Sequence, residues 1–327
     1  MHRRTALRLT TAALATALLG SAAGPALAQA DKWPERPVKI ILPYAPGGAT
    51  DLIGRPWADR LTQELKQQFV VENRGGASGT IGTEAASKAP PDGYTLLLTP
   101  NSALTVITNF RKTAYDPVKS FEPIGRVGDL IGGFVVHPSV GVKSIKELVE
   151  HAKKNPGKLA FGSAGPGTST HLRIEVLKYR AGIDILHVPY RGSADALNDL
   201  LPGNVQMMNE IIIFPHVKAG KLTLLAVNHS ERHPEFPDAP TMTEAGYPDS
   251  DVPIWYSIWA PAGTPKDIIK KLHDKVVEIA KSDEMKAKMR AINVVVPIQT
   301  PEDMLKYTVE DIKRNGDIIK AANIKLE

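Results

Sequence analysis

Short apolar runs alternate with helical patterns along most of this 327-residue chain. The runs are brief and rich in β-branched residues, which is typical of buried strands. They lie at Val38–Leu42, Phe69–Val71, Tyr94–Leu98, Phe134–Val136, Leu159–Phe161, Ile185–Val188, Val205–Met208, Leu222–Val227 and Val294–Ile298. This alternation predicts an α/β fold with mainly parallel sheets, because a helix that connects two strands of one sheet leaves them parallel.

Several of the predicted helices begin with recognisable caps. Ser144–Glu147 is a capping box, in which the hydroxyl and the carboxylate each satisfy a backbone N–H. Thr264-Pro265 and Thr300-Pro301 place a hydroxyl at the N-cap and a proline in the first turn. The helix after Thr264 has apolar residues at helical spacing, namely Ile268, Leu272, Val276 and Ile279.

The first 30 residues have the three parts of a cleavable export signal. Arg3, Arg4 and Arg8 form a basic start, an apolar stretch follows, and Ala-x-Ala spacing occurs at residues 26–28 and 28–30. A membrane anchor is the alternative, but glycine and proline interrupt the apolar stretch. We expect cleavage and a soluble periplasmic protein. The Arg3-Arg4 pair leaves twin-arginine export and general secretory export both open.

Charge and cysteine content exclude several classes of protein. Three of the 40 basic residues lie in residues 1–30, which hold no acidic residue, so the remaining chain has 37 basic against 35 acidic residues. This near balance does not favour a nucleic-acid partner. Because the chain has no Cys, it has neither a disulfide nor a lipid anchor on Cys, and it depends on a full hydrophobic core.

Two further strand-like segments, Ile124–Val136 and Ile254–Ala260, are long enough to cross between two parts of the molecule. If they do, the chain forms lobe one from residues 31–128 and 256–327 and lobe two from residues 129–255. Two crossing strands make a natural hinge.

The loop after the first predicted strand suits an anion. Gly47 and Gly48 allow a tight turn and a close approach of the backbone to a ligand. Thr50 or Asp51 can cap the helix that follows, whose N-terminus presents N–H groups and the positive end of its dipole. A tight turn with nothing bound is the alternative. A proline about one turn into this helix predicts a kink.

Three other loops repeat this design at strand ends: Arg74–Gly82, Thr99–Ser102 and Phe161–Leu172. They carry glycine and small polar residues, of which Ser78, Gly79 and Asn101 are candidates for ligand binding. Open α/β sheets bind ligands at the carboxyl ends of their strands. The four loops together therefore favour a small polar or anionic ligand.

Signatures of an enzyme or of a cofactor site are missing from the sequence. Neither a Walker lysine nor the G-x-G-x-x-G pattern accompanies the glycines. Ser163 stands where a nucleophile elbow would place it, but Phe161 replaces a required glycine. His229 and His233 have i, i+4 spacing without a third ligand. We expect no metal, no cofactor and no catalytic residue, and we interpret His171 as a positioning or capping residue.

With these loops the chain resembles the Bug-type substrate-binding proteins, which include the tricarboxylate-binding subunit of tripartite tricarboxylate transporters. The likeness covers nearly all of residues 33–327. Its marks are Trp33-Pro34, Arg36-Pro37, Pro43–Asp51, Val71–Arg74, Ala77–Gly82, Asp92–Tyr94, Gly162–Leu172, Val188–Gly192 and Ala260–Pro265.

The resemblance implies a type II periplasmic binding protein, a Venus-flytrap of two α/β lobes joined by two crossover strands. Family ligands are small carboxylates: di- and tricarboxylates, acidic amino acids and aromatic acids. Binding through backbone groups and ordered water carries over to Tyr44, Pro46, Gly47, Gly48, Thr50 and Asp51, and in lobe two to Ser163, Gly165, Thr168, Ser169, Thr170, His171 and Tyr190. The implied partners are membrane transporter subunits, and we expect a monomer.

Two positions depart from the family pattern. Arg191 stands where the family usually has Lys, and it could hold a carboxylate in a bidentate pair or point to solvent. Asn209 stands where Asp is common, and its amide removes a negative charge while it can both donate and accept. Both are candidate ligand-binding residues, and the identity of the ligand stays open.

These observations favour a periplasmic solute-binding protein that delivers a small carboxylate to a transporter. A binding protein that presents its ligand to a membrane receptor for sensing stays open, because the sequence does not separate the two. An exported α/β enzyme is the third hypothesis, and no nucleophile–base pair or metal motif supports it.

Overall fold

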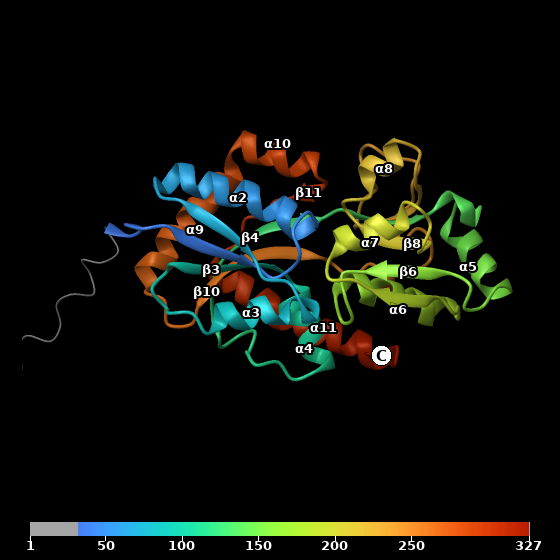
Figure 1. Ribbon diagram of the computed structural model, residues 1–327, viewed down its shortest axis with the longest axis horizontal. Helices are drawn as coiled ribbons and strands as arrows, with labels where there is room; N and C mark the ends of the chain where they lie inside the picture. Colours follow the sequence, from blue (N-terminus) through green and yellow to red (C-terminus); the bar gives the residue numbers. More distant parts are fainter. Residues whose placement is uncertain (1–31, 327) are drawn as a thin grey trace, which may run out of the picture. The chain divides into compact units, whose positions relative to one another are not determined.

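The computed structural model describes residues 32–326, so the predicted export signal of residues 1–30 lies outside the described residues. Within the described residues, the chain from Arg36 onward forms one compact unit. The compact unit contains two β-sheets with helices packed on them (Figure 1), which confirms the predicted α/β class. No helix within residues 32–326 has the length and hydrophobicity of a membrane span.

The first sheet has six strands in the order β11-β4-β10-β3-β1-β2. β1 is parallel to β2 and β3, whereas β10 runs antiparallel to β3 and β4, and β11 runs antiparallel to β4. β3 and β10 in the middle are buried along nearly their whole length, because helices cover both faces of the sheet. The bounds are β1 Val38–Leu42, β2 Phe69–Asn73, β3 Thr95–Pro100, β4 Phe121–Leu130, β10 Trp255–Pro261 and β11 Val294–Val295.

Helices α2, α9 and α10 lie on one side of this sheet, and α3, α4 and α11 lie on the other (Figure 1). α9 buries the predicted apolar face of Ile268, Leu272, Val276 and Ile279. The bounds are α2 Ala49–Leu65, α3 Thr80–Ser87, α4 Ile107–Phe110, α9 Lys266–Lys281, α10 Asp283–Ala291 and α11 Pro301–Ala321, with a short 3₁₀ turn η1 Ala77–Gly79 and a π-helical turn η2 Ser102–Val106.

The second sheet has five strands in the order β7-β6-β8-β5-β9. β6 is parallel to β7 and β8, and β5 is antiparallel to β8 and β9. α5 and α6 share one apolar core with this sheet, and α7 packs on β6 and β8. The bounds are β5 Gly132–Val136, β6 Ala160–Ser163, β7 Leu186–Pro189, β8 Met207–Glu210, β9 Thr223–Asn228, α5 Ile145–Lys154, α6 Ser169–Ala181, α7 Ser193–Leu200 and α8 Phe214–Lys218, with 3₁₀ turns η3 Pro138–Val140 and η4 Pro248–Ser250.

Three expectations about the strands are wrong in part. The sheets are mixed rather than mainly parallel, because β10 returns between β3 and β4, and β5 lies between β8 and β9 against their direction. The predicted strand Ile124–Val136 is divided at Ile131, so that β4 belongs to the six-stranded sheet and β5 to the five-stranded one. The predicted strand Val294–Ile298 pairs only over Val294–Val295.

The helix caps follow the sequence at two of the four predicted sites. Neither Thr50 nor Asp51 is the N-cap of α2, because the helix already begins at Ala49 with Gly48 as its N-cap. The Ser144 hydroxyl accepts from the Glu147 N–H, and the Thr300 hydroxyl accepts from the Asp303 N–H. Thr264 does not cap α9, because its hydroxyl donates to the Pro261 carbonyl at 2.7 Å instead. Pro56, at which a kink was predicted, lies inside α2 and does not end it, since α2 continues as one helix to Leu65.

Candidate functional site

One pocket is lined by residues that come from both sheets and from the loops that open three helices. The room left in it for the centre of a water molecule is about 20 Å³, and its free space is about 360 Å³ when the part open to solvent is included. The lining residues are Tyr44, Ala45, Gly48, Ala49, Thr50, Pro100, Ser102, Ala164, Thr168, Thr170, Ser193, Glu210, Ile254 and Tyr256. This set contains no Lys, Arg or His.

The N-termini of α2, α6 and α7 meet at this pocket. Gly48 is the N-cap of α2, Thr168 is the N-cap of α6, and Ser193 is the first residue of α7. The first N–H groups of a helix have no acceptor within it, and the helix dipole places positive charge there. α2 and α7 have glycine N-caps that supply no side-chain hydrogen bond. The pocket can therefore attract an anion without a cationic side chain.

The glycine loop before α2 is held by the carboxylate of Asp51. Gly47 has φ of +80°, a conformation that favours glycine, and its N–H donates to Asp51 Oδ2 at 3.2 Å. Arg55 Nε and Asn73 Nδ2 donate to the same carboxylate at 2.8 and 3.1 Å. Burial opposes ionisation of Asp51, but these hydrogen bonds hold its pKa below the ordinary value. Asp51 thus fixes the conformation of the glycine loop and is not among the residues that line the pocket.

Gly48 is the point of closest approach between the α2 loop and α7. The Ala49 N–H donates to the Ser193 hydroxyl at 3.4 Å. A Cβ added to Gly48 would lie 2.9 Å from Ser193 Oγ. The backbone of Gly48 is extended, with φ of −84°, so a larger residue is excluded there by space and not by backbone strain.

Two buried tyrosines form much of the remaining wall. The Tyr44 hydroxyl donates to the Ser78 carbonyl at 3.0 Å, and its ring fills the space beside Gly79. The Tyr256 hydroxyl lies 3.3 Å from Thr50 Oγ1. Burial raises the pKa of both phenols well above the ordinary value, so both remain neutral hydrogen-bonding groups.

Glu210 contributes the only carboxyl group of the lining set. It is the last residue of β8 and is 4% exposed. Burial raises the pKa of Glu210 to about 7, although the Ile211 N–H, Arg173 and Ser193 favour its ionised form. The Ile211 N–H donates to Glu210 Oε2 at 2.7 Å.

Arg173 on α6 interacts electrostatically with Glu210 and with Asp251. Its Nε donates to the Val252 carbonyl at 2.7 Å, and neither Nη1 nor Nη2 has a hydrogen-bond partner among the described residues. Burial lowers the pKa of this guanidinium to about 10. It remains a cation at neutral pH, outside the lining of the pocket.

Of the residues predicted from the sequence, Tyr44, Gly48, Thr50, Thr168 and Thr170 line the pocket. Four other candidates line a separate hollow on the surface, together with the exposed Arg111: Ser78, Gly165, Tyr190 and Arg191. There Ser78 Oγ donates to the Pro166 carbonyl at 2.6 Å, and the Tyr190 hydroxyl donates to Asp199 at 2.6 Å. Pro46 and Gly47 are exposed, and Gly79 packs on Tyr44.

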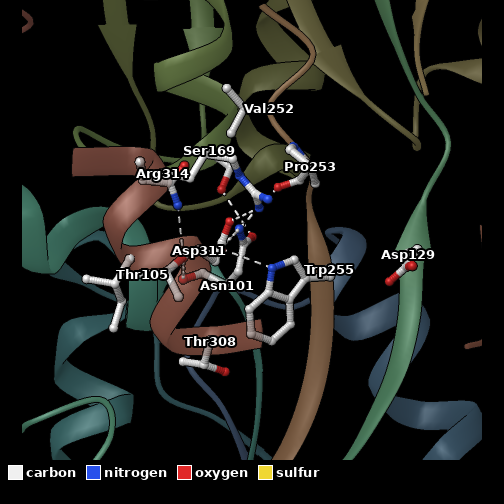
Figure 2. Close-up of polar contacts among 12 residues, drawn as sticks. Asn101, Thr105, Asp129, Ser169, Val252, Pro253, Trp255, Thr308, Asp311 and Arg314 are labelled. Carbon is white, nitrogen blue, oxygen red and sulfur yellow. Dashed lines mark hydrogen bonds and ion pairs between the residues drawn. The ribbon is translucent and has the colours of Figure 1, made fainter. Parts of the chain in front are cut away.

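Asn101 and Ser169 belong to a buried polar network centred on Asp311 of α11 (Figure 2). Asp311 Oδ2 accepts from Asn101 Nδ2 at 3.0 Å, from Thr105 Oγ1 at 2.6 Å and from Trp255 Nε1 at 3.0 Å. The Ser169 hydroxyl donates to Asn101 Oδ1 at 3.2 Å. Both predicted residues therefore support the pocket without lining it.

The last three predicted residues point into the core around β6. The Ser163 hydroxyl lies 2.7 Å from His187 Nε2. His171 accepts from the Gly167 N–H at 3.2 Å and lies ring against ring with His187, at 4.2 Å between centroids. Burial, with His187 and Lys178 adding to it, lowers the pKa of His171 to about 3. Asn209 donates to the Thr170 carbonyl at 2.7 Å, and its Oδ1 is unpartnered among the described residues.

Sequence reasoning missed three polar lining residues: Ser102, Ser193 and Glu210. Tyr256, which the sequence offered only as an aromatic side chain that could cover the ligand, also lines the pocket. Ser102 is the last residue of the Thr99–Ser102 loop, Ser193 follows the Val188–Gly192 motif by one residue, and Glu210 follows Asn209 directly. An extension of each set of candidates by one residue would have included all three.

Among the described residues no cluster of three or more metal-ligating side chains forms. His229 and His233 do not act as a pair, since His233 Nε2 lies 2.6 Å from Asn293 Oδ1.

Comparisons with known proteins agree with this arrangement. The family model described as tripartite tricarboxylate transporter family receptor, TctC, matches residues 53–324. Protein BugT of Bordetella pertussis (strain Tohama I) is 34% identical over 302 residues, which cover 91% of this chain and 93% of BugT.

Two solved structures show the same fold with ligands. R. palustris Rpa4515 with adipate has a TM-score of 0.86 at 33% identity, covering 90% of this chain and 99% of that one. MatC from Rhodopseudomonas palustris with bound malate has a TM-score of 0.83 at 28% identity, covering 88% of this chain and all of that one. The chain therefore belongs to the tripartite tricarboxylate transporter receptor family, the periplasmic solute-binding proteins of the TctC and Bug type.

Proposed function

We propose that this protein captures a small dicarboxylate in the pocket between its two sheets and delivers it to membrane subunits of a tripartite tricarboxylate-type transporter. The observation that carries the proposal is the convergence of three helix N-termini on a pocket without a cationic side chain. Adipate and malate in two structural relatives support the choice of four- to six-carbon dicarboxylates.

In this proposal one carboxylate of the ligand lies at the starts of α2, α6 and α7. Backbone N–H groups and the hydroxyls of Thr50, Thr170 and Ser193 donate to it. The Thr168 hydroxyl instead donates to the Gly165 carbonyl. Tyr44 and Tyr256 exclude water from the carbon chain. A micromolar affinity requires about 8 kcal/mol, which several charge-assisted hydrogen bonds and apolar burial can supply.

The proposal also includes the closure of two lobes over the ligand and the location of the protein in the periplasm. Residues 31–128 and 256–327 form one lobe and residues 129–255 the other, and they open at the crossing segments to admit the ligand. The export signal of residues 1–30 is removed, and the protein works in the periplasm as a binding protein and not as an enzyme.

Thermal unfolding and calorimetric titration of the exported protein test this function. Succinate, malate, adipate and citrate form the panel, with acetate and inorganic phosphate as controls. A dicarboxylate at a hundred times its Kd should stabilise the fold by about 2.7 kcal/mol, and the same compound should be recovered unchanged. If no acid releases heat or raises the Tm of the folded protein, dicarboxylate capture is wrong; conversion of the bound acid would instead indicate an enzyme.

A further inference from the structure

We propose that Glu210 is a specificity-determining residue of the pocket, and that it holds a proton when the ligand is bound and donates a hydrogen bond to a carboxylate of the ligand. This inference rests on the proposed capture of a dicarboxylate. It adds which acidic side chain of the pocket recognises a carboxylate of the ligand, and that a proton is taken up with the ligand.

The position of Glu210 is the first argument. Its side chain lines the same small pocket as the three helix N-termini, yet it is 4% exposed and has little access to water. The helix starts attract one carboxylate of a dicarboxylate. Glu210 lies against these helix starts, because the Ser193 hydroxyl that opens α7 is hydrogen-bonded to it. A carboxylate bound at the helix starts therefore lies beside Glu210.

The charge balance of the pocket is the second argument. An ionised Glu210 would add a third negative charge beside a bound dianion, in a buried place where repulsion between charges is strong. A protonated Glu210 is instead a neutral donor, and a hydrogen bond from a neutral donor to a carboxylate is among the stronger kinds.

The groups around Glu210 compensate only in part for the charge of its ionised form. The Ile211 N–H donates to it, and the Ser193 hydroxyl is hydrogen-bonded to it. Arg173 of α6 is the cation that interacts with it, and Asp251 shares that guanidinium. The strands β5 and β6 beside β8 contain no ionisable residue. On α7, Asp195 is exposed and Asp199 accepts from Tyr190.

The remaining ionisable groups near Glu210 are neutral. Tyr44 and Tyr256 both interact with it and have a raised pKa. His171 of α6 lies against His187 and has a pKa lowered to about 3 by burial. Burial accordingly raises the pKa of Glu210 itself to about 7, so protonation near neutral pH costs little and an anionic ligand favours it further.

The sign of the pH dependence follows. In the free protein Glu210 loses its proton as the pH rises through about 7, whereas the complex retains it. The affinity for a dicarboxylate should therefore fall on the order of tenfold from pH 6 to pH 8, with proton uptake on binding near pH 7.

The test compares wild type with Glu210→Gln, which keeps the shape and the donor of a protonated glutamate but does not titrate. Calorimetric titrations with the dicarboxylate that binds wild type best are run at pH 6 and pH 8, in pairs of buffers with different ionisation enthalpies. Wild type should take up protons and weaken about tenfold at pH 8. Glu210→Gln should bind at both pH values with nearly the pH 6 affinity of wild type and take up no proton.

Two further variants complete the test. Glu210→Met fills the space without a donor and should bind at least tenfold more weakly at both pH values. Glu150→Gln removes an exposed glutamate of α5 and should keep the wild-type pH profile. Thermal unfolding of each variant checks that it is folded.

The proposal is overturned if wild type binds a dicarboxylate without proton uptake, or if Glu210→Gln loses more than tenfold in affinity at pH 6. Tighter binding of an amino acid than of the dicarboxylate of equal length would also overturn it, because an ammonium group pairs with ionised Glu210. Failure of the proposed function is a different result, in which wild type binds no dicarboxylate at either pH.

Discussion

The hydroxyl oxygens of Ser102 and Ser169 lie 3.0 Å apart, and they join the end of β3 in one sheet to the start of α6 beside the other. Ser102 Oγ also accepts from the Ser169 N–H at 3.0 Å. Because the Ser169 hydroxyl donates to Asn101, the contact continues into the buried network around Asp311. The pocket and this network therefore share one segment, residues 101–102.

Asp311→Ala should destabilise the protein by about 3–5 kcal/mol. The carboxylate is fully buried and accepts from Asn101, Thr105 and Trp255. Its removal takes the acceptor from these buried donors and breaks the ion pair with Arg314. Urea unfolding followed by tryptophan fluorescence measures the effect. Asp317→Ala on the same helix removes an exposed ion pair with Lys313 and should change stability by less than about 1 kcal/mol. Equal effects of the two variants would show that the network contributes little.

Gly48→Val should abolish ligand binding and leave the fold intact. The added side chain meets Ser193 Oγ at a distance that real Cβ atoms do not reach, so α2 and α7 are pushed apart where the ligand carboxylate is proposed to lie. The extended backbone of Gly48 tolerates valine, so the Tm should change by only a few degrees. Titration with the best wild-type ligand measures binding, and retained affinity would remove the glycine loop from the site.

Thr300→Ala should cost about 1 kcal/mol of stability, because the N-cap of α11 loses its acceptor for the Asp303 N–H. Thr300→Ser retains the hydroxyl and serves as the control. Chemical denaturation at pH 7 compares the two variants with wild type. A loss of the same size in both variants would assign the effect to the methyl group and not to the cap.

The stability of the protein should fall as the pH is lowered from about 6.5 toward 4. Burial lowers the pKa of His171 to about 3 and that of His187 to about 4, whereas both titrate near 6.5 in the unfolded chain. The unfolded state then binds more protons in this window, and the folded state loses stability as the pH falls.

His187→Gln isolates this effect, because the raised pKa of Glu210 acts with the opposite sign in the same range. Between pH 7 and pH 5 the variant should lose about 1–2 kcal/mol less than wild type, after allowance for the partial exposure of His187. Denaturation at the two pH values measures this difference, and His151→Gln, outside the ring stack, is the control. Identical losses in wild type and His187→Gln would contradict the prediction.

The sequence by itself determined those features that depend on residues close together in the chain, such as strand bounds and helix caps. The strand Val38–Leu42 was predicted at its observed bounds, and the caps Ser144 and Thr300 act as predicted. Both depend on residues within a few positions of one another. The glycine loop before α2 belongs to the same class, since its turn and its helix start are set by neighbouring residues.

Only the tertiary structure decided which polar groups face the ligand space. Asn101 and Ser169 follow the same loop pattern as Thr168, but Asp311, more than 140 residues further along the chain, draws both into its network. Glu210 lines the pocket because β8 pairs with β5 and packs beneath α7. A side chain turns toward the partner that satisfies it best, and when that partner is distant in sequence, no local pattern contains the information.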